Sequence, residues 1–159
     1  MVKDKLVIEG GRRLKGKVKI ASAKNAVLPI LAATLLTEKK VILKEISLVA
    51  DVLTMVDLLK AIGSQIKIDN NNLIIDNSQV NSFNPPEEST KKIRASYYLI
   101  APLLSRFKRV KINYPGGCEI GTRPIDLHIK GLMALGAKII LREKYLEGEV
   151  EDFKGNEIY

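Results

Sequence analysis

Hydrophobic and polar residues follow a pattern of helices and strands that occurs twice along this chain. An apolar run from Lys24 to Leu36 predicts a buried helix, and Asp51 to Gly63 has the spacing of an amphipathic helix. The apolar stripe of that second helix is predicted to comprise Leu53, Val56, Leu59 and Ala61. Strands are predicted at 41–43, 65–68 and 72–75, the last two joined at Asn70-Asn71. The order then recurs as a helix over 94–104, a strand at 110–112, a helix over 123–136, and strands at 138–141 and 145–150.

The residues themselves support this repeat. Segment 61–66 resembles segment 134–139, and each contains the glycine that ends a helix. The two segments are 73 residues apart, whereas the helix starts at Lys24 and Arg94 are 70 residues apart. The second copy therefore holds three additional residues between its helices, in the interval that contains 115–121. A loop added to a repeated scaffold is a candidate functional site.

Two further segments complete the predicted organisation. Residues 1–20 contain two apolar runs that predict short strands around a glycine turn, and residues 79–92 are rich in polar residues and proline and predict a linker. We therefore expect an α/β (α+β) chain. Its parts are N-terminal strands over 1–20, a first repeat unit over 21–78, the linker over 79–92, and a second unit over 93–159 with a loop at 114–123.

Composition and charge narrow the function classes. The 159 residues, 46% of them hydrophobic, are enough for a domain with its own core. An excess of 26 Lys and Arg over 18 Asp and Glu gives a net charge of +8, which favours anionic partners such as phosphorylated metabolites. A solvated basic surface, or a fragment of a more acidic protein, explains the charge equally well. Nucleic-acid binding is poorly supported, because the cations are scattered and aromatic residues make up only 5%.

Several classes of site and location are not expected. The single cysteine cannot form an internal disulfide, no apolar run reaches the roughly 20 residues of a membrane span, and the first residues do not form a signal peptide. We therefore expect a cytoplasmic protein with no membrane partner. One cysteine and one histidine do not make a metal site, and no phosphate-binding glycine motif occurs, so no metal or cofactor is expected.

Cys118 is the first candidate for chemistry. It follows two glycines, and Lys111 and Arg123 are among the cations near it in sequence. Nearby positive charge favours the thiolate and makes a thiol a usable acid or nucleophile near neutral pH. The alternative is an inert buried cysteine, which is the commoner fate of a lone thiol, although the glycine-rich setting favours a surface loop.

Lys24 and Arg94 occupy equivalent positions, each at the start of a helix. A cation there is unfavourable for the helix, but together with the free N–H groups it favours a phosphate or carboxylate ligand. Asn25 adds a further hydrogen-bond donor. Two exposed cations placed by chance are the alternative.

The segment from Arg123 to His128 starts the next predicted helix, directly after the cysteine loop. Pro124 and Asp126 suit a first helical turn, and Arg123 has the fork geometry that binds a diphosphate. His128 is more readily explained as a packing residue, or as a residue that supports a neighbouring ligand-binding side chain, than as a base.

Taken in order, these motifs resemble the UDP-N-acetylglucosamine 1-carboxyvinyltransferases, the enolpyruvyl transferases of peptidoglycan synthesis. The matching residues are Lys24-Asn25, Arg94-Ala95-Ser96, Pro115-Gly116-Gly117-Cys118 and Arg123-Pro124-x-Asp126-x-His128. The resemblance implies two lobes, each an inside-out α/β barrel of three βαβαββ units, of which this chain contains about two of the six. It also implies that residues 1–20 pack with the other lobe.

The resemblance implies a reaction and a role for each site residue. Enolpyruvyl is transferred from phosphoenolpyruvate to UDP-N-acetylglucosamine, without a cofactor. Lys24 and Asn25 bind phosphoenolpyruvate, and Cys118 protonates it and is the target of fosfomycin. Arg94 belongs to the sugar-nucleotide site, which is lined further by Arg123, Pro124, Ile125, Asp126 and Leu127.

The chain is less than half as long as members of that family. We expect it to be an N-terminal fragment without turnover of its own, whose partner is the C-terminal part of the enzyme. A non-catalytic module that binds a nucleotide sugar or a phosphate is the alternative function.

Overall fold

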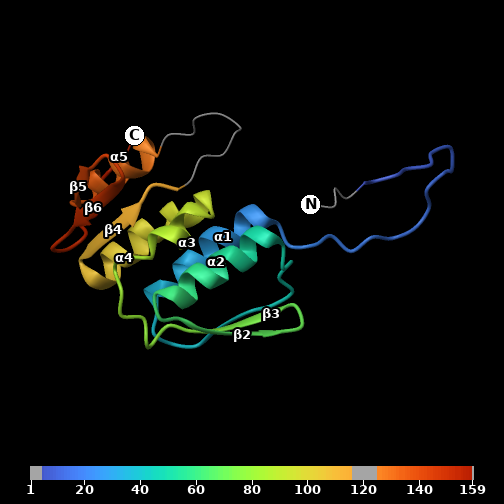
Figure 1. Ribbon diagram of the computed structural model, residues 1–159, viewed down its shortest axis with the longest axis horizontal. Coiled ribbons are helices and arrows are strands. Elements are labelled where there is room, and N and C mark those ends of the chain that lie inside the picture. Colours follow the sequence, from blue (N-terminus) through green and yellow to red (C-terminus); the bar gives the residue numbers. More distant parts are fainter. Residues whose placement is uncertain (1–4, 116–124, 159) are drawn as a thin grey trace.

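The structure, a computed structural model, describes residues 5–115 and 125–158. Its helices and strands succeed one another twice in a similar order (Figure 1). They are α1 (Lys24–Ala33), the 3₁₀ helix η1 (Thr34–Leu36), β1 (Val41–Leu43), α2 (Ala50–Ala61), β2 (Gln65–Asp69), β3 (Asn72–Asp76), α3 (Glu87–Lys91), the 3₁₀ helix η2 (Arg94–Leu99), α4 (Ile100–Phe107), β4 (Arg109–Asn113), α5 (Asp126–Ala134), β5 (Lys138–Leu141) and β6 (Tyr145–Glu149).

Each unit closes into a small three-stranded sheet with the same topology. The strand orders are β1-β3-β2 and β4-β6-β5, and every neighbouring pair is antiparallel. The last strand along the chain therefore lies in the centre of each sheet, between the other two. The predicted α/β class, the strand pairs and the repeat are confirmed.

The corner that follows the second helix is built from the same backbone hydrogen bonds in both units. The Ile62 carbonyl accepts from the Asn81 N–H at 3.3 Å, and the Leu135 carbonyl accepts from the Lys154 N–H at 2.9 Å. In each case the residue after the carbonyl is a glycine, with φ of +109° in the first unit and +100° in the second. That left-handed backbone favours glycine and turns the chain from helix into strand.

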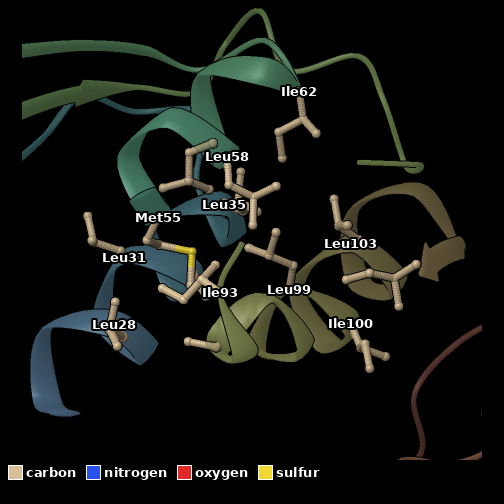
Figure 2. Close-up of a cluster of buried hydrophobic side chains, with 14 of the residues drawn as sticks. Leu28, Leu31, Leu35, Met55, Leu58, Ile62, Ile93, Leu99, Ile100 and Leu103 are labelled. Carbon is tan, nitrogen blue, oxygen red and sulfur yellow. The ribbon is translucent and has the colours of Figure 1, made fainter. Parts of the chain in front are cut away.

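Helices of both units form one hydrophobic core. Leu31 and Leu35 of the first unit lie with Met55 and Leu58 of α2 opposite Leu99 of the second unit (Figure 2). The sheets cover this helical core from outside. A Cβ at Gly148 of β6 would lie 3.3 Å from a methyl carbon of Leu104, so the bare glycine lets α4 approach the sheet closely.

A buried polar cluster joins the two units. Asn77 is fully buried, donates to the Thr34 carbonyl at 2.7 Å and accepts from the Ser64 hydroxyl at 2.6 Å. Arg106 of α4 crosses from the second unit and donates to the carbonyls of Asn77 at 2.8 Å and Leu35 at 3.3 Å. Buried polar groups are therefore satisfied at the contact between the units.

The apolar stripe predicted for α2 was partly wrong. Val56 and Leu59 are buried as expected, but Ala61 is exposed and Leu53 is 37% exposed. The buried face also includes Val52, Met55 and Leu58. Because α2 packs against α1 as well as η2 and α3, its buried surface is wider than a single stripe and is centred on a different side of the helix.

Residues 5–23 do not form the two strands predicted within 1–20. The apolar side chains of this segment, from Leu6 to Ile20, are 78–94% exposed, and the segment extends away from the helices (Figure 1). A strand needs a neighbouring strand with which to share backbone hydrogen bonds. Within the described parts of the chain, no strand edge lies next to residues 5–23. Lys19 pairs with Glu45 at 2.8 Å, which ties the segment to the first unit.

The segments around the second apolar helix also differ from the prediction. Residues 79–92 are not a featureless linker, since they contain α3 and the buried residues Val80 and Thr90. The helix predicted over 94–104 begins as η2 and becomes α-helical only at Ile100. Pro102 lies in the first turn of α4, where the missing N–H of a proline is tolerated.

Candidate functional site

Lys24 lies at the first position of α1, where it forms an ion pair with the next helix. Its Nζ is 2.7 Å from Oδ2 of Asp51, which lies in the first turn of α2. The two side chains are 47% and 46% exposed. Asp51 therefore compensates the unfavourable placing of a cation at a helix start, and its own charge stabilises the start of α2. This structural benefit was not foreseen from the sequence.

Asn25 follows Lys24 in the first turn of α1, and its side chain is exposed. The residue before the helix is Ala23, which has no polar side chain to cap the first N–H groups. The start of α1 therefore offers a cation, an amide side chain and backbone donors on an open surface.

Arg94 begins η2 and is half-buried. The pKa of Tyr98 is raised, first by its hydrogen bond with Tyr97 and then by burial, whereas the positive charge of Arg94 acts in the opposite direction. Because η2 packs against α1, the helices that carry Arg94 and Lys24 are neighbours.

Ile125, Asp126 and Leu127 form the start of α5. Ile125 is half-buried at the N-cap position, Asp126 is exposed in the first turn, and Leu127 is 74% exposed. No residue of α5 is fully buried. The proposed ligands on this turn are therefore presented on the surface rather than held in the core.

His128 connects this turn of α5 to η2. Its ring meets the Tyr97 ring edge-on at a centroid distance of 5.0 Å, and the Tyr98 ring lies 6.5 Å away. The contact brings the start of α5 beside the helix that begins at Arg94. Its interpretation as a packing residue agrees with this geometry, but the two tyrosines were not recognised as its partners.

Cys118, Arg123 and Pro124 lie outside the described residues. Tyr114, just before the cysteine loop, lines an open hollow of about 500 Å³ with Ile125, Ile129 and other residues of α5 and β5. Burial raises the pKa of the Tyr114 hydroxyl. Tyr114 and Ile125, which lie on either side of residues 116–124, therefore line the same largely apolar hollow.

Two further properties concern residues 5–115 and 125–158. No three His, Cys, Asp or Glu side chains come close enough there to hold a metal ion. None of the helices in those ranges has the length and apolar character needed to cross a membrane.

Comparison with known proteins finds one matching family and several similar proteins. The family described as EPSP synthase (3-phosphoshikimate 1-carboxyvinyltransferase) matches residues 8–159. A UDP-N-acetylglucosamine 1-carboxyvinyltransferase from Buchnera aphidicola is 50% identical over 157 residues, covering 98% of this chain and 38% of that protein. UDP-N-acetylglucosamine 1-carboxyvinyltransferase 2 from Clostridium tetani is 48% identical over 158 residues, with the same coverage.

A solved structure agrees with the fold. The enolpyruvyl transferase NikO from Streptomyces tendae superposes with a TM-score of 0.75 over 91% of this chain and 32% of that protein, at 17% identity. At 17% sequence identity, this similarity supports the fold and says nothing about function. The chain spans 38% of the length of each of these two curated relatives.

Proposed function

The chain belongs to the EPSP synthase (3-phosphoshikimate 1-carboxyvinyltransferase) family, and we propose that it serves the transfer of enolpyruvyl from phosphoenolpyruvate to UDP-N-acetylglucosamine. One observation carries this choice of substrates. Over 98% of its length the chain is about half identical to proteins named for that transfer. The reaction would serve peptidoglycan synthesis in the cytoplasm.

The start of α1 would bind phosphoenolpyruvate. Lys24 supplies a half-exposed ammonium, Asn25 an exposed amide, and the uncapped first turn supplies backbone N–H groups. All three kinds of donor suit a phosphate or carboxylate. Holding the phosphate there favours its departure, because positive charge stabilises the leaving group.

The start of α5 and the start of η2 would bind the sugar nucleotide. Arg94 lies on η2, and Ile125, Asp126 and Leu127 lie on the turn that His128 holds against that helix. Arg123 and Pro124, directly before this turn in sequence, complete the proposed set. An arginine can bind a diphosphate through two parallel hydrogen bonds.

Cys118 would act as the proton donor. Its thiol proton adds to the methylene carbon of phosphoenolpyruvate, which leaves the neighbouring carbon electron-poor. A hydroxyl of the sugar forms a bond to that carbon and gives up its proton. The carbon–oxygen bond to phosphate then breaks, a proton leaves the new methyl group, and the double bond is restored. The same thiol is the proposed target of fosfomycin.

We propose further that these 159 residues bind substrate without turning it over, since they span 38% of the length of the relatives. The test has two parts on the same protein. Ligand-observed NMR should detect phosphoenolpyruvate and UDP-N-acetylglucosamine binding, and a phosphate-release assay with both substrates should show no turnover. Phosphate release would contradict the proposed lack of turnover, and the absence of binding to either substrate would contradict the proposed site.

Matched lysine variants make the binding test specific. Lys24→Met should weaken phosphoenolpyruvate binding, whereas Lys91→Met should not, because Lys91 is also exposed and ion-paired but lies on α3 with Glu87. Mass spectrometry after fosfomycin treatment, with and without UDP-N-acetylglucosamine, then separates a reactive site from a non-catalytic binding module. Modification confined to Cys118 supports the reactive site, and binding without modification favours the module.

A further inference from the structure

We propose that Asp51 is a positioning residue for Lys24. Asp51 holds the Lys24 ammonium through a direct hydrogen bond. When substrate binds, the ammonium exchanges that hydrogen bond with Asp51 for one with a phosphate oxygen of the substrate. When phosphate leaves, Asp51 takes the ammonium back. This inference rests on the proposed function of Lys24.

The geometry of the pair allows such an exchange. The Nζ of Lys24 and the Oδ2 of Asp51 are 2.7 Å apart, which is a direct charged hydrogen bond. Both side chains are nearly half exposed, so a dissolved anion can reach the ammonium without disturbing the core. A lysine ammonium has three donors and a flexible stem, and can turn from one acceptor to another.

Asp51 keeps a favourable environment when the ammonium turns away. It lies in the first turn of α2, where the partial positive charge of the helix end stabilises a carboxylate. The residue before α2 is Val49, which has no polar side chain to cap the helix. The carboxylate is therefore an interaction partner for its own helix as well as for Lys24.

The strength of the pair also suits an exchange. An ion pair between exposed side chains changes an equilibrium constant by no more than about fivefold. A phosphate with two negative charges, bound next to uncapped N–H groups of α1, competes successfully with a single carboxylate of that strength. The remaining effect of Asp51 is a modest weakening of phosphate binding and a faster release.

Calorimetric titration of the 159-residue chain with phosphoenolpyruvate tests this inference. Asp51→Asn removes the competing charge and should bind about two- to fivefold more tightly. Asp51→Glu retains the charge and should bind like the unchanged protein. Asp152→Asn is the matched control, because Asp152 is also exposed and pairs with Lys108 at 2.7 Å, but lies after β6; its affinity should not change.

A second lysine variant separates exchange from a merely structural role. In Lys24→Met the additional change Asp51→Asn should no longer tighten binding by that factor, because no ammonium remains to be released. A structural role predicts a lower melting temperature for Asp51→Asn at unchanged affinity, and this result would overturn the inference.

The outcomes also distinguish this inference from the proposed function. If Lys24→Met abolishes binding but Asp51→Asn leaves the affinity unchanged or weakened, the exchange is wrong and the proposed function stands. If binding occurs but does not depend on Lys24, the proposed role of Lys24 fails and the exchange with it. If neither the unchanged protein nor Asp51→Asn binds phosphoenolpyruvate, both are contradicted.

Discussion

The imidazole ring of His128 packs edge-on against the phenol ring of Tyr97, with the ring planes at 74°. The contact links α5 to η2, two elements separated in sequence by a whole helix and strand. Ile129 and Leu132 attach α5 to the core, and the exposed His128 adds this aromatic contact with η2.

Replacing His128 should therefore loosen α5. We expect His128→Ala to lower the free energy of unfolding by about 0.5–1.5 kcal/mol, and to speed hydrogen exchange of the α5 amides more than those of α2. His128→Phe keeps an aromatic edge and should retain most of the protection. Equal hydrogen-exchange rates of the α5 amides in the unchanged protein, His128→Ala and His128→Phe would show that the ring contact does not hold α5.

Arg106 should contribute far more to stability than an exposed arginine. Its side chain is 13% exposed and donates to two carbonyls of the first unit. Arg106→Met leaves both carbonyls without that donor and should cost about 1.5–3 kcal/mol in urea unfolding. Arg142 is 52% exposed and pairs with Glu147, so Arg142→Met should cost less than about 0.5 kcal/mol. Similar losses in the two variants would contradict the prediction.

The two corner glycines should differ in their tolerance of alanine. Both have φ near +100°, and an added Cβ costs about 1–2 kcal/mol there. At Gly63 the Cβ would also lie 2.6 Å from the Gln79 carbonyl oxygen, whereas at Gly136 it would lie 3.6 Å from that of Asp152. Gly63→Ala should therefore be more destabilising in thermal unfolding by about 1–3 kcal/mol. A larger loss of stability in Gly136→Ala than in Gly63→Ala would show that the backbone at Gly63 shifts to accommodate the added Cβ.

The pair of Lys108 and Asp152 should depend on pH in a defined direction. The hydrogen bond and charge of Lys108 lower the pKa of Asp152 from its ordinary value of 3.8. A lowered pKa means that the pair is fully formed above pH 3.8 and is lost as the pH falls through the lowered value.

Carboxyl NMR titration checks this effect. Lys108→Met should raise the pKa of Asp152 toward 3.8, while the pKa of Glu45 stays low because Lys19 lowers it independently. An unchanged Asp152 titration would show that Lys108 does not perturb it.

The sequence predicted correctly those elements that depend on residues close together in the chain. Helix starts at Lys24, strand pairs around Asn70, and the glycine at each corner depend on residues that are close in the chain, and they were found. The strands expected in residues 1–20 were not, because strand formation depends on a neighbouring edge that a sequence pattern does not supply. The 3₁₀ start at Arg94 was missed because an apolar pattern does not distinguish a 3₁₀ helix from an α-helix.

The site was predicted by residue type but not by contact. Lys24 and Asn25 were expected at an anion site, yet Asp51 was considered only as the start of a helix. Its pairing with Lys24 depends on how α1 packs on α2, which no spacing in the sequence reveals. The same applies to Tyr97 and His128. The roles of all the proposed site residues stay predictions, including those of Cys118, Arg123 and Pro124.

Arg106 has a consequence for how the protein unfolds. Its guanidinium is the donor for two carbonyls that belong to the other repeat unit, and those carbonyls lie beside the fully buried Asn77. In repeat proteins the stability is approximately a sum of terms for each unit and for its contacts with its neighbours. Here the first unit cannot open without removing the acceptors of a buried charge that belongs to the second unit. The two copies should therefore denature in a single cooperative transition, with one midpoint for probes placed in either sheet.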